Sequence, residues 1–203
     1  MTQTRIGILG GTFDPPHNGH LLLARAAYEQ LELDRVLFMP VGDPTHKSRA
    51  DLTRVSDRVA MTVLATHEEA EFQLDLTDAL RPEPHYTVML LPLLLSQYKN
   101  TEFWLVMGGD SLRDLHKWHL PDALLTMCRF AVLPRPGAEL EWGTLQERFP
   151  NIRERVDLLG GETLELSSTW LRGNWASAES QFHVPPAVSA YITHHHLYNL
   201  AQA

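Results

Sequence analysis

The sequence predicts an α/β fold, in which a mostly parallel β-sheet carries helices on both faces. Short apolar runs alternate with helix-like segments along the whole chain, and this alternation implies right-handed crossovers between parallel strands. The chain has 203 residues, of which 44% are hydrophobic, so its size and composition are those of one globular domain. We therefore expect residues 1–203 to form a single domain.

The expected strands and helices follow one another in regular order. Short apolar runs predict strands at residues 6–9, 36–39, 72–74, 103–107, 130–133, 156–159 and 164–166. Longer segments predict helices at residues 21–31, 53–67, 86–98 and 187–195, with further helical turns near Leu145 and Trp170. Pro92 should kink the third of these helices or shift its start.

The charge balance narrows the class of partner. Seventeen Lys and Arg residues stand against twenty-five Asp and Glu residues, a net charge of −8, which argues against non-specific binding to nucleic acid or an anionic membrane. We expect neither as a partner. The N-terminal residues show no signal-peptide pattern, and the one cysteine, Cys128, fits a reducing compartment, so we expect a cytoplasmic protein. A homo-oligomer is compatible with the sequence, which leaves the oligomeric state open.

Ligands of parallel α/β sheets bind beyond the carboxyl ends of the strands. The segments that follow the expected strands are therefore the place to search for a site. They are residues 10–20, 40–47, 108–111, 134–137 and 167–172.

The first of these segments carries the strongest signal. Gly10 and Gly11 let backbone amides approach a ligand closely, and two prolines stiffen the loop that follows. His17 and His20 then open a helix, with Asn18 as its expected N-cap. Two histidines at the positive end of a helix dipole suit triphosphate oxygens, although such a pair can also simply cap and pack. The segment is neither a P-loop nor a GxGxxG fingerprint.

The run Gly-Gly-Thr-Phe-Asp-Pro-Pro-His-Asn-Gly-His at residues 10–20 resembles the signature of the HIGH-motif nucleotidyltransferase superfamily. Within that superfamily it is most similar to the bacterial nicotinate-nucleotide adenylyltransferase family. The resemblance implies a Rossmann-like fold. It also implies transfer of AMP from ATP to nicotinate mononucleotide, giving deamido-NAD and pyrophosphate.

Two further segments resemble phosphate-binding motifs of that family. Asp-Pro-Thr-His-Lys at residues 43–47 is similar to its Pro-Pro-His-Lys element, with Thr45 in place of the second proline. Ser-Ser-Thr-Trp-Leu-Arg at residues 167–172 resembles its Ile-Ser-Ser-Thr-x-Ile/Leu-Arg motif, with Leu166 in the Ile place. Taken alone, Lys47 could be a solvated lysine and the Ser-Ser-Thr run a plain helix cap. Two motifs of one superfamily at opposite ends of the chain favour the functional interpretation.

Three segments resemble the part of the family that holds the acceptor and the adenine. Gly-Gly-Asp-Ser-Leu at residues 108–112, with Trp118 downstream, is similar to its ribose and ring elements, although His119 stands where a second aromatic ring is usual. Pro-His-Tyr-Thr at residues 84–87 resembles an element near the mononucleotide. Arg-Pro-Gly at residues 135–137 resembles a loop near the adenine and phosphates.

These motifs predict a set of site residues. We expect catalytic roles for His17 and His20, which would bind the phosphoryl oxygens. The expected ATP and phosphate ligands are Gly10, Gly11, Thr12, Phe13, Lys47, Arg135, Ser168, Thr169 and Arg172. The expected acceptor ligands are Tyr86, Thr87, Gly108, Asp110 and Trp118. Mg²⁺ is implied as a cofactor carried by the ATP phosphates, without metal ligands from the protein.

Other functions remain open on the sequence alone. A sister transferase could use nicotinamide mononucleotide, phosphopantetheine or a cytidylyl donor, and a non-catalytic nucleotide sensor could keep the same fold. A class I aminoacyl-tRNA synthetase also carries His-x-Gly-His, but this chain has no obvious Lys-Met-Ser-Lys-Ser element. The three histidines at residues 194–196 cannot converge on one metal ion, because consecutive helical residues point about 100° apart.

Overall fold

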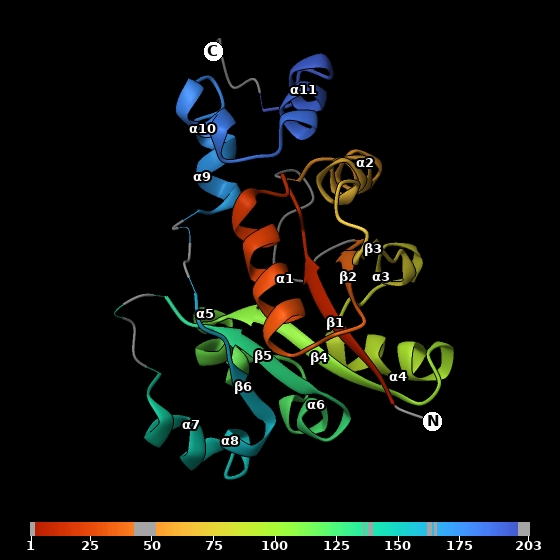
Figure 1. Ribbon diagram of the computed structural model, residues 1–203, viewed down its shortest axis with the longest axis vertical. Helices are drawn as coiled ribbons and strands as arrows, with labels where there is room; N and C mark the ends of the chain where they lie inside the picture. The colour runs from red at the N-terminus through yellow and green to blue at the C-terminus, as the bar shows by residue number, and fades with distance from the viewer. Residues whose placement is uncertain are drawn as a thin grey trace.

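The structure is a computed structural model that describes residues 3–42, 52–135, 137, 140–161, 164 and 166–198 (Figure 1). In this part of the chain one parallel sheet has the strand order β3-β2-β1-β4-β5-β6. Its strands are β1 (Thr4–Gly11), β2 (Arg35–Pro40), β3 (Phe72–Leu74), β4 (Thr101–Gly108), β5 (Arg129–Leu133) and β6 (Val156–Leu158). The predicted α/β fold with its Rossmann-like sheet is confirmed. The strand order reverses between β1 and β4, which places the expected ligand cleft there.

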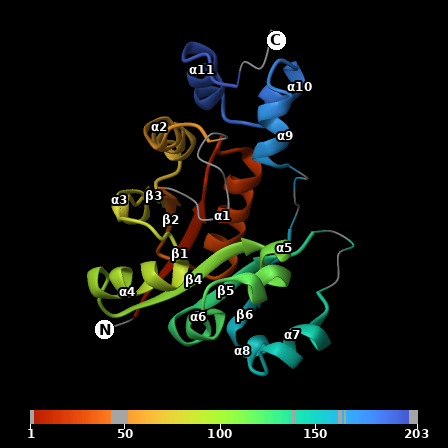
Figure 2. The same ribbon diagram turned by 180° about the vertical axis from the view of Figure 1, so that it is seen from behind.

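Helices cover both faces of this sheet and one end of it. They are α1 (Asn18–Gln30), α2 (Val55–Thr66), α3 (Thr77–Leu80), α4 (Thr87–Gln97), α5 (Gly109–Arg113), the 3₁₀ helix η2 (Asp114–Lys117), α6 (Pro121–Met127), α7 (Trp142–Arg148), α8 (Ile152–Arg155), α9 (Ser168–Gly173), α10 (Ala178–Phe182) and α11 (Pro186–His194). Figure 1 shows α1 in front of the sheet, and the reverse view in Figure 2 shows α4 and α6 on the other face.

Side chains alternate along the strands and pack into two separate apolar cores. Ile6 and Ile8 of β1 pack into the cluster that contains Leu91 of α4, whereas Leu9 packs into the cluster that contains Ala24 of α1. Strands buried on both faces read as continuous apolar runs, which is why their positions could be predicted from the sequence.

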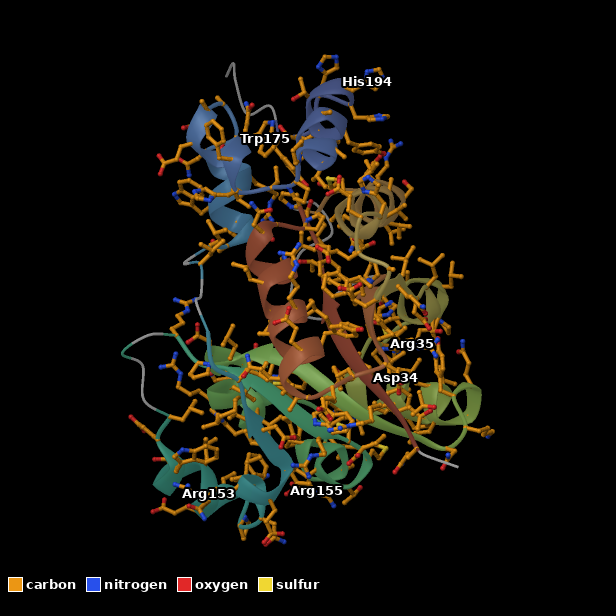
Figure 3. The ribbon with its side chains drawn as sticks, viewed as in Figure 1. Asp34, Arg35, Arg153, Arg155, Trp175 and His194 are labelled. Atoms are coloured by element: carbon orange, nitrogen blue, oxygen red, sulfur yellow. The ribbon has the colours of Figure 1, made fainter. Side chains whose placement is uncertain are left out.

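A third apolar cluster holds the C-terminal helices against α2. It joins Met61 of α2 to Leu171 of α9, Trp175 and Val188 of α11, and Figure 3 shows Trp175 among the C-terminal helices. This cluster matters for function because it brings α9, which follows the last strand in the chain, next to the loop that follows the first strand.

The structure also corrects details of the predicted elements. The expected strand at residues 164–166 is wrong for its two described residues, since Leu166 N–H donates to Leu164 O at 2.8 Å, a local turn in place of pairing with the sheet. Helix α4 runs from Thr87 through Pro92 to Gln97, so the proline lies inside the helix. Among the described residues, none of the helices is long and apolar enough to cross a membrane.

Candidate active site

A cavity of about 580 Å³ lies at the carboxyl ends of β1 and β4, where the strand order reverses. Segments from both ends of the chain line it. Its lining includes most of the predicted site residues: Gly10, Gly11, Thr12, His17, His20, Thr87, Gly108, Asp110, Trp118, Arg135, Ser168 and Thr169. The cavity therefore gathers residues from separate motifs into one place.

The two motif histidines form a stacked pair at the start of α1. Their ring centroids lie 3.7 Å apart, and the backbone N–H of His17 donates to Nδ1 of His20 at 3.2 Å. Since Nδ1 of His20 accepts this bond, the neutral ring carries its proton on Nε2. The N-cap is His17 rather than the predicted Asn18, whose side chain instead donates to the Phe182 carbonyl at 3.1 Å.

Burial keeps both imidazoles neutral. It lowers the pKa of His17 from its ordinary 6.5 to about 4, an effect reduced by a hydrogen bond to the residue's own backbone and increased by nearby His183. Burial, with the neighbouring His17, also lowers the pKa of His20 well below its ordinary value. The pair can therefore supply neutral N–H donors at the N-terminus of α1, but not two positive charges.

Glycine at position 19 makes this stacking possible. A Cβ atom there would lie 3.0 Å from Nδ1 of His17, closer than nearly all real contacts of a Cβ atom. The Nδ1 atom of His17 is itself buried without a hydrogen-bond partner. The His-x-Gly-His spacing thus leaves one imidazole resting over the glycine and beside the other imidazole.

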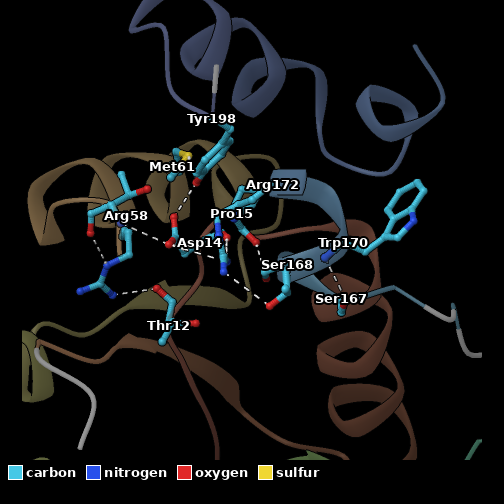
Figure 4. Close-up of polar contacts among 12 residues, drawn as sticks. Thr12, Asp14, Pro15, Arg58, Met61, Ser167, Ser168, Trp170, Arg172 and Tyr198 are labelled. Carbon is cyan, nitrogen blue, oxygen red and sulfur yellow. Dashed lines mark hydrogen bonds and ion pairs between the residues drawn. The ribbon is translucent and has the colours of Figure 1, made fainter. Parts of the chain in front are cut away.

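The start of α9 is attached to the first loop, and Figure 4 shows the two segments together. The Ser167 side chain caps α9 by accepting from the Trp170 N–H at 3.1 Å. The Ser168 hydroxyl donates to the Pro15 carbonyl at 3.0 Å, across 153 residues of sequence. Ser167, Ser168 and Thr169 line the same cavity as the histidine pair. The Ser-Ser-Thr run is therefore both a helix cap and part of the cavity wall.

Arg172 does not line that cavity. Its guanidinium donates to the Asp14 carbonyl at 2.7 Å, and the same nitrogen lies 3.7 Å from the Asp14 carboxylate. It lines a second cavity of about 970 Å³, which shares Thr169 with the first. In this structure, Arg172 holds the backbone of the first loop.

Asp14 and Arg58 support the site but were not predicted from the sequence. Asp14 is fully buried, and its carboxylate accepts from the Thr53 N–H at 3.2 Å and the Tyr198 hydroxyl at 2.6 Å. Arg58 is 1% exposed and donates to the carbonyls of Thr12 at 2.7 Å and Gly42 at 2.8 Å. Asp14 stood inside the motif, but nothing in the local sequence marked Arg58.

Four of the predicted acceptor residues line the cavity. Asp110 lines the cavity and forms an ion pair with Arg135 at 2.8 Å and another with Arg113. Trp118, Thr87 and Gly108 also line the cavity.

Tyr86 and Phe13, two further predicted site residues, do not line the cavity. The Tyr86 ring stacks on His119 at 4.1 Å, which gives His119 an aromatic partner within the protein. Phe13 is buried, and its ring packs in a T-shaped arrangement against the His20 ring with the centroids 5.0 Å apart, so it supports the histidine. Lys47 lies outside the described residues.

Comparison with known proteins gives a consistent result over the full length of the chain. Residues 8–174 match the family model described as cytidylyltransferase-like. A protein of Thermomicrobium roseum named probable nicotinate-nucleotide adenylyltransferase is 39% identical over 202 residues, which cover 99% of this chain and 94% of that protein. A protein of Neisseria meningitidis with the same name is 38% identical over 199 residues, covering 96% and 98%.

Among solved structures, Plasmodium falciparum nicotinic acid mononucleotide adenylyltransferase complexed with NaAD matches with a TM-score of 0.79. The match covers 97% of this chain and 98% of that one, at 19% sequence identity. At this identity the likeness is one of fold, and it extends over the whole arrangement of sheet and helices described above.

Proposed function

This chain belongs to the cytidylyltransferase-like family and, within it, to the nicotinate-nucleotide adenylyltransferases, and from that premise we propose how its residues carry out the reaction. It is a nucleotidyltransferase that moves AMP from ATP to nicotinate mononucleotide, giving deamido-NAD and pyrophosphate. The remaining question is which side chains of this chain bind each substrate.

One observation supports the assignment above all others. The loop after β1 and the start of α9, 153 residues apart in sequence, meet through the bond from Ser168 to Pro15 and line one cavity with His17 and His20. Hydroxyl groups and imidazole N–H groups that face one space are donors, and a triphosphate presents only acceptors. The cavity therefore suits the phosphate chain of ATP.

The chemistry requires positioning and charge stabilisation more than covalent work from the protein. An oxygen of the acceptor phosphate forms a bond to the α-phosphorus of ATP, while the bond from that phosphorus to the bridging oxygen breaks and pyrophosphate leaves. We assign to His20 the donor that binds an α-phosphate oxygen through its Nε2–H. The positive end of α1 adds to this stabilisation, because 13 residues of aligned peptide dipoles point at the site.

The other phosphate contacts follow from the position of each donor. We assign Ser168, Thr169 and the exposed Arg135 guanidinium to the β- and γ-phosphates, and Thr12 with the amides of Gly10 and Gly11 to the nucleotide. Lys47 keeps its role as a phosphate ligand on sequence grounds alone. For Arg172 we propose a different role from the one that its motif predicted: it holds the first loop through Asp14.

The acceptor occupies the other end of the same cavity in this proposal. Trp118 offers an aromatic face for the pyridine ring, Thr87 a hydroxyl and Asp110 a carboxylate for ribose hydroxyls. The ion pair between Asp110 and Arg135 links the acceptor residues to the phosphate residues. Mg²⁺ enters as part of the MgATP substrate, bound to the β- and γ-phosphates.

We propose the cytoplasm as the location and the two nucleotides as the partners. The net charge of −8 disfavours binding to nucleic acid or anionic membranes, and Cys128 is a buried thiol whose pKa burial raises to about 12. A thiol of this kind is protonated at neutral pH and poorly reactive.

A direct assay tests the function. Purified protein is incubated with ATP and Mg²⁺ and with nicotinate mononucleotide, nicotinamide mononucleotide or phosphopantetheine, and pyrophosphate release is measured. We expect the highest kcat/KM with nicotinate mononucleotide. A preference for the amide or for phosphopantetheine would overturn the acceptor assignment, and ATP binding without pyrophosphate release from any acceptor would indicate a nucleotide sensor.

A further inference from the structure

A buried carboxylate–histidine pair also forms part of the cavity wall. Asp78 of α3 and His85, in the loop before α4, both line the cavity. Nδ1 of His85 lies 3.3 Å from Oδ1 of Asp78, and the side chains are 3% and 10% exposed, respectively. A pair of this kind at a substrate cavity is a candidate for binding or proton chemistry.

The surroundings hold this pair in a single geometry. Arg81 Nε donates to the same Asp78 oxygen at 2.6 Å, and its terminal nitrogens donate to the carbonyls of Pro84 at 2.6 Å and Tyr86 at 3.2 Å. The guanidinium thus ties the carboxylate to the backbone on both sides of His85. Gly42 leaves room for the imidazole, since a Cβ atom there would lie 2.8 Å from its Cε1 atom.

The two nitrogens of His85 have different surroundings. Nδ1 faces Asp78, to which it can donate its proton, whereas no hydrogen bond is found at Nε2 among the residues that the structure describes. His85 lines the cavity, so its Nε2 is available to a ligand that binds there. With Nδ1 directed at Asp78, an Nε2–H group is a donor toward a ligand in the cavity, and the Asp78 carboxylate fixes the orientation of the ring.

We propose that His85 is a specificity residue that donates from Nε2 to the carboxylate of the pyridine ring and so favours the acid acceptor over its amide. This inference rests on the proposed function. His85 precedes Tyr86, whose ring stacks on His119, and it lines the same cavity as Trp118. The acceptor phosphate belongs near His17 and His20. The carboxylate is therefore the anionic group within reach of His85.

Two conservative variants separate the proposed contact from a structural role. In His85→Asn the amide nitrogen takes the place of Nδ1, so the link to Asp78 is kept and the Nε2 donor is lost. In His85→Gln the amide nitrogen takes the place of Nε2, so a neutral donor to the substrate is kept and the link to Asp78 is lost. Thermal unfolding of each variant checks that it folds.

The measurement compares both acceptors. The kcat/KM values with nicotinate and nicotinamide mononucleotide, the KM for ATP and the dissociation constants of both mononucleotides are determined for the parent and both variants. We expect His85→Asn to weaken use and binding of the acid by about 10- to 100-fold, as for a lost hydrogen bond to a charged group. The amide values and the KM for ATP should change less than about threefold, and His85→Gln should recover part of the loss.

Other outcomes overturn the inference in recognisable ways. Equal losses with the acid and the amide would indicate a contact to their shared phosphate or a structural role. A defect in His85→Gln with normal behaviour of His85→Asn would show that only the link to Asp78 matters, and unchanged acid binding in both variants would exclude the contact. A parent protein that uses neither mononucleotide would instead refute the proposed function itself.

Discussion

The Tyr198 hydroxyl donates a hydrogen bond of 2.6 Å to the Asp14 carboxylate, joining the segment after α11 to the motif loop after β1 across 184 residues (Figure 4). Burial and the negative charge of Asp14 raise the pKa of Tyr198, so the hydroxyl keeps its proton and remains a donor. Arg172 approaches the same aspartate from α9. The C-terminal helices thus hold the catalytic loop through one buried carboxylate.

Tyr198→Phe tests this link. The change leaves a buried carboxylate short of one donor, which should lower the free energy of unfolding by roughly 1–3 kcal/mol. Urea denaturation measures it. Tyr191→Phe is the matched control, because its hydroxyl donates to Asp57 at 2.9 Å nearer the surface, and it should change stability by less than about 1 kcal/mol. Equal effects of the two variants would argue against a special role for the Asp14 contact.

Arg172→Gln and Arg135→Gln distinguish the loop-holding role from phosphate binding. Arg172→Gln removes the donor to the Asp14 backbone and should lower the free energy of unfolding by about 1–3 kcal/mol. Arg135→Gln breaks an exposed ion pair, so stability should change by less than about 1 kcal/mol while the KM for ATP rises. If Arg172→Gln raised the KM for ATP and left stability unchanged, the motif-based role of Arg172 on the triphosphate would be restored.

His20→Ala should lower kcat by about 10²–10³-fold, the usual effect of losing one preorganised donor to a developing charge. The variant should fold, which circular dichroism can check. His67→Ala, at an exposed histidine just beyond α2, serves as the control and should leave kcat unchanged. Turnover of His20→Ala within a few-fold of the parent would remove His20 from the mechanism.

Gly19→Ala should separate activity from stability. Alanine favours a helix over glycine by about 1 kcal/mol, so stability should hold or rise. The new Cβ atom, 3.0 Å from Nδ1 of His17, must push that ring away, and kcat should fall by at least about 10-fold. Gly143→Ala in α7 is the control, since nothing lies within 4 Å of its added Cβ atom. Full activity of Gly19→Ala would show that the stacked geometry is dispensable.

The neutral histidine pair predicts a pH dependence of stability. Above pH 6.5, His17 is neutral in the folded and unfolded chains. Between pH 6.5 and about 4 the unfolded chain binds a proton that the folded chain does not, so the free energy of unfolding falls as the pH falls. The shift of His17 is worth roughly 3 kcal/mol, and the lowered pKa of His20 acts in the same direction.

Urea denaturation across this pH window measures the effect. His17→Asn should give a flatter profile than the parent, because asparagine does not titrate. A parent and variant with parallel profiles would show that His17 is not held neutral by the fold.

Whether a secondary-structure element could be predicted depends on whether neighbouring residues alone carry its pattern. The strands at β1, β2, β4 and β5 are continuous apolar runs, and burial on both faces produces that pattern wherever the strand lies in the sheet. Residues 164–166 alternate Leu-Glu-Leu, as in a half-buried strand, but the two described residues form a turn instead. Three alternating residues are too few to tell a strand from an irregular segment.

The site residues divide in the same way, into those that belong to a local motif and those that do not. The motifs that contain His17 and Ser168 could be recognised because the chemistry needs those residue types at a fixed local spacing. Asn18 was misassigned as the N-cap by one residue, since His17 takes that place. Arg58 could not be predicted, because a buried arginine that binds the carbonyls of Thr12 and Gly42 looks in sequence like any arginine on a helix.

The sequence by itself determined the α/β class, the family and a set of site residues most of which line the cavity, because strand patterns and phosphate-binding loops depend on neighbouring residues. Only the tertiary structure decided that Arg172 binds Asp14, that burial leaves the histidine pair neutral, and that Asp78 and His85 meet at the cavity wall. The charge state and the hydrogen-bond partners of a side chain depend on which distant groups the fold brings together and on how far burial desolvates them. Neither can be predicted from the local sequence.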